Sequence, residues 1–200
     1  METKVVRTVD EIGRGENDCG PIALRTVAYW YNNRTITQEE SYKICSFNGN
    51  GLESPGLARA LHSINIPFQW LTDVTKFMIK LLLDSQFNSN TPNFENSKYC
   101  LSYKLYNRVD DLWLESLQSH LNNGGISIVE VNAHVILNEM YSLSDDKKWN
   151  LFQGGHYLTV YKIDPDYVFT NEDTPVNKIP RDLFIRSFNY HTCSKSIFLI

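Results

Sequence analysis

The sequence has no long hydrophobic run. The apolar stretch FMIKLLL, residues 77–83, is interrupted by Lys80. A membrane-spanning helix needs about 20 predominantly apolar residues, so we expect no span. The first fifteen residues, METKVVRTVDEIGRG, lack the apolar centre of a signal peptide. We therefore expect the chain to be cytoplasmic as synthesised, and export by a route that needs no signal peptide stays open.

Positive charge is not in excess either. Lysine and arginine together number 19 against 23 acidic residues, and the net charge is −4. Domains that bind nucleic acid usually carry a basic patch, so we expect no nucleic-acid partner. The four cysteines lie far apart and form no CxxC pair, which argues against a zinc site and a disulfide framework. We expect free thiols, no metal and no cofactor.

What is present is a globular composition with helical patterns in the first part of the chain. Hydrophobic residues make up 42% of the 200 residues, and a chain of this length can form one domain over residues 1–200. Apolar spacing predicts a helix from Cys19 or Gly20 to about Asn32. Further helices are expected after the capping-box pattern Thr37-Gln-Glu-Glu40, from Ser54-Pro55, and within VDDLWLESLQSHLNN, residues 109–123.

The pattern changes after Gly124-Gly125. The segments ISIVEV (126–131), HYLTVYKI (156–163) and DYVFTN (166–171) are rich in β-branched and aromatic residues and predict strands. A short helix in IPRDLFIRSF (179–188) and a last strand in SIFLI (196–200) follow. Helices followed by strands of an antiparallel sheet indicate an α+β fold.

The stretch GENDCGPIAL, residues 15–24, places Cys19 where the first helix should begin. A helix N-terminus stabilises a thiolate, because its N–H groups and dipole favour negative charge. Gly20 allows another part of the backbone to come close, and the Cys19 N–H can point into an oxyanion hole. The alternative is a buried structural cysteine.

A nucleophilic cysteine needs a base, and His156 is the strongest of five histidines. It follows Gly154-Gly155 and opens a predicted strand. The next strand ends in Asn171-Glu172-Asp173, and a hairpin would bring one of these side chains to the imidazole ring. The other histidines lie in amphipathic helices, after a strand or in a polar turn: His62, His120, His134 and His191.

Two stretches resemble the family-39 cysteine peptidases, which include the bacteriocin-leader peptidase domains. They are NDCGPIALRTVAYWYN (17–32) and GGHYLTVYKIDPDYVFTNEDTP (154–175). The resemblance implies a papain-like α+β fold, with the nucleophile on a helix N-terminus and an antiparallel sheet carrying the histidine. It implies Cys19 as nucleophile, His156 as base, and Asp173 or Asn171 as the residue that orients His156. We favour Asp173, because the family often uses an acid just before a proline.

The chain departs from this family at the oxyanion hole. Relatives usually carry a glutamine six residues before the nucleophile, and that position here is Gly13. Asn17 is the nearest amide, so the expected oxyanion donors are the Asn17 side chain and the Cys19 N–H, with Arg14 as another possible donor.

These features predict a thiol hydrolase, most simply a peptidase acting on a peptide or protein substrate, as a bacterial effector or a processing enzyme. Two alternatives stay open. The same thiol chemistry serves glutamine deamidases and transglutaminases, and a catalytically inactive relative would be a peptide-binding module.

Overall fold

The computed structural model describes residues 18–49, 51–72, 100–105, 112–142, 144, 155–171, 177–190 and 195–200. Three helices come first: α1 (Cys19–Asn32), α2 (Gln38–Cys45) and α3 (Ser54–Ser63). Three more follow in the second half of the chain: α5 (Leu112–Asn122), α6 (Ala133–Met140) and α7 (Arg181–Asn189).

The described strands form one sheet in the order β2-β1-β7-β3-β4-β5-β6. Neighbouring strands run antiparallel, apart from the parallel pair β1–β2. The bounds are β1 (Phe68–Thr72), β2 (Cys100–Leu105), β3 (Ser127–Asn132), β4 (Gly155–Ile163), β5 (Tyr167–Thr170), β6 (Lys178–Pro180) and β7 (Ser196–Leu199). The predicted α+β class, with helices first and the antiparallel sheet towards the C-terminus, is therefore confirmed.

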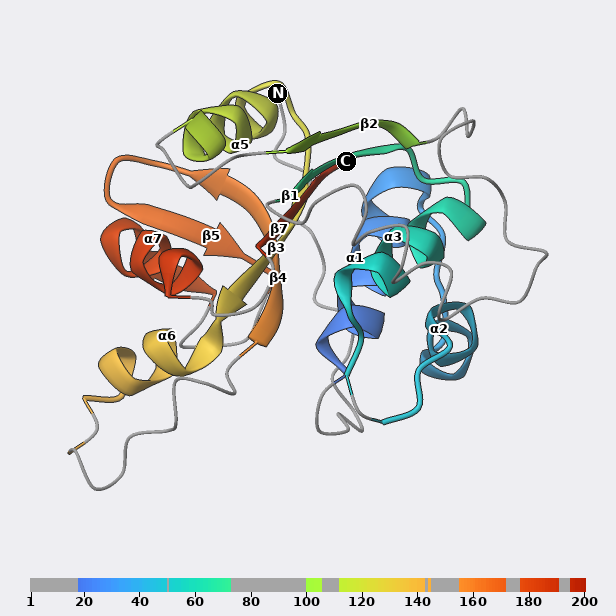
Figure 1. The fold of residues 1–200 in the computed structure, drawn as a ribbon, viewed down its shortest axis with the longest axis horizontal. Helices are drawn as coiled ribbons and strands as arrows, with labels where there is room; N and C mark the ends of the chain where they lie inside the picture. The colour runs from blue at the N-terminus through green and yellow to red at the C-terminus, as the bar shows by residue number, and fades with distance from the viewer. Residues whose placement is uncertain are drawn as a thin grey trace.

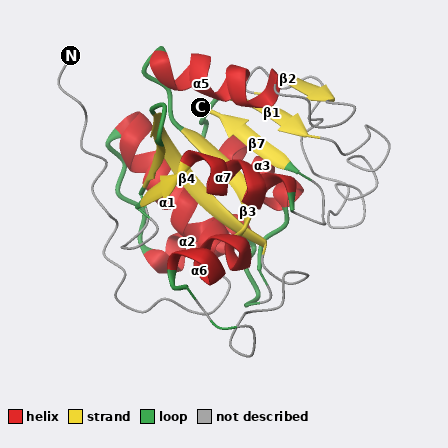
Figure 2. Cartoon of the chain, turned by 90° about the vertical axis from the view of Figure 1, so that its left-hand side faces the viewer, coloured by secondary structure: helices red, strands yellow, loops and turns green. Residues whose placement is uncertain are grey.

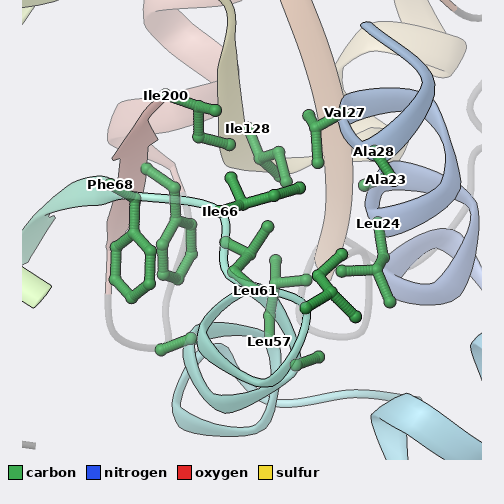
Figure 3. Packing of buried hydrophobic residues seen from close by; sticks show 14 of the residues in the cluster. Ala23, Leu24, Val27, Ala28, Leu57, Leu61, Ile66, Phe68, Ile128 and Ile200 are labelled. Carbon is green, nitrogen blue, oxygen red and sulfur yellow. The ribbon is translucent and has the colours of Figure 1, made fainter. Parts of the chain in front are cut away.

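The sheet lies between two layers of helices (Figure 1). One core forms against α1 and α3 and contains Leu24, Leu57 and the strand residue Ile128. Figure 3 shows this core, with the α1 and α3 side chains meeting those of the strands. The other core forms on the opposite face against α5, α6 and α7, and it contains Val129 and Phe184. Figure 2 views the sheet from that side.

The central strands are apolar on both faces because each face is covered. Ile128 and Val129 are neighbours in β3, both are 0% exposed, and they belong to different cores. Side chains alternate between the two faces of a strand, so the run of apolar residues serves both layers. The core to which a strand residue belongs therefore shows which face of the sheet its side chain occupies, and the next residue along the strand occupies the other face.

The helices expected from local signals are confirmed. The Thr37–Glu40 capping box forms: the Glu40 N–H donates to Thr37 Oγ1 at 3.2 Å, and the Thr37 N–H donates to Glu40 Oε2 at 2.9 Å. Helix α5 ends before Gly124, whose φ of 86° suits glycine.

Four elements were not predicted from the sequence. Strands β1, β2 and β6 form where no strand was expected. Helix α6 starts directly after β3, so His134 lies in a helix.

Candidate active site

Cys19 is the first residue of α1 and is half-buried. Pro21 occupies the first turn, where its missing N–H costs nothing. Gly20 is required for packing, because a Cβ there would lie 2.7 Å from Leu52 Cδ2. The glycine therefore lets the start of α1 approach the segment that precedes α3.

Asp18 precedes Cys19 and is almost fully buried, at 4% exposure. It occupies the N-cap position of α1, but its side chain makes no capping hydrogen bond to that helix. Instead, Asp18 Oδ2 accepts a hydrogen bond of 2.9 Å from the hydroxyl of Tyr42 on α2. The Asp18 carboxylate, next to the candidate nucleophile, is thus held by a side chain of α2.

His156 lies at the start of β4, after the exposed Gly155. Helix α1 packs against β4, and both views show the two elements beside each other (Figures 1 and 2). The pairing of β3 with β4 sets Val131 opposite His156, and Glu130 opposite Tyr157. Val131 belongs to the core on the α6 and α7 side, so the pleat directs His156 to that face and Tyr157 to the face of α1.

A buried polar chain lies on the α1 side of β3 and β4. The Tyr157 hydroxyl and Ser54 Oγ are 2.9 Å apart, and Ser54 Oγ donates to Glu130 Oε2 at 2.7 Å. Since the serine proton goes to the carboxylate, the tyrosine donates to the serine. Burial raises the pKa of Tyr157 well above its usual value, and the negative charges of Glu130 and of a Cys19 thiolate raise it further. Tyr157 therefore stays neutral and lies within electrostatic range of Cys19.

Asn171 follows β5 and is directed towards α1. Its Nδ2 donates to Thr26 Oγ1 at 3.2 Å, and its backbone N–H donates to the carbonyl of Thr159 at 2.9 Å. Thr26 lies seven residues after Cys19, which is two turns along the same side of α1. The amide nitrogen of Asn171 thus ties the end of β5 to α1.

The other residues expected at the site lie outside the described residues, namely Asn17 and Asp173, as do Gly13 and Arg14. Sequence reasoning missed Tyr42 and Tyr157. A tyrosine in a helix or a strand is ordinarily a packing residue, and the partners of these two are far away in sequence, 24 residues for Tyr42 and 103 for Tyr157.

The remaining histidines of the described segments lie on other helices. His120 Nε2 is 2.8 Å from the Ile200 carbonyl oxygen and 3.1 Å from that of Ile126. His62 lies at the end of α3, and His134 lies in the first turn of α6.

Neither a metal-binding cluster nor a membrane-spanning helix is found in the part of the chain that the structure describes. It contains no group of three or more His, Cys, Asp or Glu side chains placed to hold a metal ion. None of its helices combines the length and apolar character needed to cross a membrane.

The chain was compared with known protein families, curated sequences and solved structures. No protein-family model and no curated protein sequence matches the chain. Among solved structures, it is similar to the peptidase domain of Streptococcus ComA, a bifunctional ABC transporter involved in a quorum-sensing pathway. The two share 17% sequence identity with a TM-score of 0.45, over 97% of this chain and 95% of that one.

Proposed function

We propose that this protein is a cysteine peptidase that cleaves a peptide or protein substrate, as an effector or a processing enzyme. Cys19 is the nucleophile and His156 is the general base. The observation that carries the proposal is the packing of α1, which begins with Cys19, against β4, which begins with Gly155 and His156. A half-buried thiol at the N-terminus of a helix that packs against a strand beginning with a histidine suits nucleophilic catalysis.

The reaction follows the chemistry of these groups. His156 takes the thiol proton, and the Cys19 sulfur attacks the carbonyl carbon of the substrate. The Cys19 N–H and the Asn17 side chain donate to the oxyanion. His156 then gives the proton to the leaving amine, which leaves a thioester on Cys19. Water, deprotonated by His156, hydrolyses the thioester and releases the acid product and the free thiol.

Asp173 is the residue that we favour for orienting His156. The amide nitrogen of Asn171 already donates to Thr26. The backbone N–H of Asn171 pairs with Thr159, three residues beyond His156, and three residues of a strand span about 10 Å. Asn171 therefore fits a role in fixing α1 better than a direct bond to the imidazole.

A peptide-binding module without activity is the second candidate, and the register of β4 favours it. Because His156 pairs with Val131, on the face away from α1, its ring must turn round the end of the strand to reach Cys19. The exposed Gly155 leaves that end of β4 accessible. If the ring does not make this turn, His156 cannot take the proton of the thiol.

Mass spectrometry of a proteome-derived peptide library separates these functions. The library is incubated with the wild type, with Cys19→Ala and, as the control for loss of a thiol, with Cys45→Ala. A peptidase produces new chain termini with the wild type and the control, but none with Cys19→Ala. A gain of about one dalton on glutamine would indicate a deamidase instead. Peptides bound but unmodified by all three proteins would favour the binding module.

A further inference from the structure

The N-cap of α1 differs from those of the other described helices that start after a good capping residue. Thr37 caps α2 and has φ −69° and ψ 163°. Asn132 caps α6 through the backbone N–H groups of His134 and Val135. Asp18 is an equally good capping residue, yet its side chain caps nothing, and its backbone has φ −91° and ψ 16° instead of the extended conformation.

Because Asp18 does not cap α1, backbone N–H groups of the first turn of this helix are left without a capping acceptor. Pro21 has no N–H, and the Ile22 N–H donates to the Asp18 carbonyl at 3.1 Å. The N–H groups of Cys19 and Gly20 therefore have no acceptor within the helix. A capping Asp18 carboxylate would take one of these donors and would place a negative charge beside the Cys19 sulfur.

Tyr42 holds the Asp18 carboxylate in its present place. Gln38 Nε2 donates to the Tyr42 oxygen at 2.6 Å, so the tyrosine proton is directed to Asp18 Oδ2, at 2.9 Å. Burial raises the pKa of Tyr42, and the Asp18 carboxylate raises it further against the opposing effect of Gln38. Tyr42 therefore keeps its proton and remains a donor over the working pH range.

We infer that Tyr42 is a positioning residue of the active site, which keeps Asp18 from capping α1 so that the Cys19 and Gly20 N–H groups serve the thiolate and the oxyanion. The inference rests on the proposed function of Cys19 and adds a control on its reactivity. It makes α2, which carries neither the nucleophile nor the base, necessary for that reactivity.

Two measurements on Tyr42→Phe, its thermal stability and the reactivity of Cys19, distinguish a positioning role of Tyr42 from a purely structural one. In Tyr42→Phe, Asp18 loses the hydroxyl that holds it and can turn to cap α1, and capping stabilises a helix. That gain offsets the lost tyrosine hydrogen bond, so thermal stability should change little. The carboxylate then lies near the sulfur, and a like charge within about 4–6 Å raises a thiol pKa by about one unit or more. Cys19 should therefore react about ten times more slowly near pH 6.

The experiment measures the rate of iodoacetamide alkylation at Cys19 against pH, by mass spectrometry of the peptide that contains it. Four proteins are compared: the wild type, Tyr42→Phe, the double variant Tyr42→Phe/Asp18→Ala, and Tyr29→Phe. The last removes a half-buried tyrosine hydroxyl ten residues further along α1. We expect the midpoint to rise by about one pH unit in Tyr42→Phe, to return in the double variant, and to be unchanged in Tyr29→Phe.

Either of two results would overturn the inference. The first is an unchanged midpoint in Tyr42→Phe, whether or not its thermal stability falls. The second is a raised midpoint that Asp18→Ala does not restore. Failure of the proposed function gives a different result, namely a wild-type midpoint near the ordinary thiol value of about 8.5 that His156→Ala does not move. The Tyr42→Phe comparison can still be made in that case, because a carboxylate brought to the sulfur raises the midpoint of any thiol.

Discussion

Removing the Ser54 hydroxyl should destabilise the protein more than an ordinary serine substitution. Ser54 and Tyr157 are each 3% exposed, and Ser54 links the Tyr157 hydroxyl to the Glu130 carboxylate. Ser54→Ala leaves a buried phenol without its acceptor, which costs about 1–3 kcal/mol, and deletes a bond to a charged group worth a similar amount. We expect a loss of about 2–4 kcal/mol in the free energy of unfolding.

Urea denaturation followed by tryptophan fluorescence measures this loss, since Trp70 and Trp113 are buried, at 2% and 4% exposure. The matched control is Ser187→Ala. Ser187 is also fully buried, but its hydroxyl donates only to the Phe184 carbonyl of its own helix, so we expect a cost below about 1 kcal/mol.

A double-mutant cycle with Tyr157→Phe tests the reason for the loss. If the cost of Ser54→Ala comes from the stranded phenol, removing both hydroxyls should cost at least about 1 kcal/mol less than the sum of the single changes. The reasoning is refuted if Ser54→Ala costs less than about 0.5 kcal/mol, or if the two changes are additive.

Three further predictions concern other parts of the molecule. In Gly125→Ala, the new Cβ would lie 2.1 Å from His120 Nε2; the ring must leave two backbone carbonyls, so we expect a loss of about 1–3 kcal/mol, measured by urea denaturation. Burial raises the pKa of Cys45 to about 12. Because the thiolate is the reactive form, Cys45 should resist iodoacetamide at pH 8 in the folded protein and react in urea. Alkylation of Cys45 as fast as that of Cys19 in the native state would contradict this. Asn171→Ala should cost about 1 kcal/mol while the pH midpoint of Cys19 alkylation stays unchanged, and a shifted midpoint would instead assign Asn171 to the imidazole.

The sequence predicted the elements whose signals are local. Helix α1 begins at Cys19, where Pro21 and the apolar spacing of Leu24, Val27 and Ala28 mark a first turn and a buried face. The Thr37–Glu40 capping box lies within four residues, and its two hydrogen bonds form as expected. Signals of this kind need no knowledge of the rest of the fold.

The missed elements depend on distant parts of the chain. Strand β1 lies between β7 and β2 in the sheet. Its residue Trp70 pairs with Phe198, and the two are 128 positions apart in the sequence. Helix α6 follows β3 without a loop, in a segment for which the sequence predicted no element. The N-cap residue Asn132 was the available signal for this helix, since its side chain accepts from two N–H groups of the first turn.

The residues of the candidate site also differ in whether a local sequence signal marks them. Cys19 and His156 were proposed as site residues from the sequence because short motifs surround them. Tyr42 was not, because its importance comes from the Asp18 carboxylate on another helix, which the sequence pattern does not connect to it. The register that sets His156 opposite Val131 also emerges only from the pairing of β3 with β4.

The most direct test of the central proposal is the pH dependence of Cys19 alkylation in the wild type and in His156→Ala. A thiol paired with an imidazole should react quickly down to about pH 5–6, and this reactivity at low pH should be lost when the ring is removed. A midpoint near about 8.5 in both proteins would contradict the pairing of Cys19 with His156 and would leave the peptide-binding module as the better account.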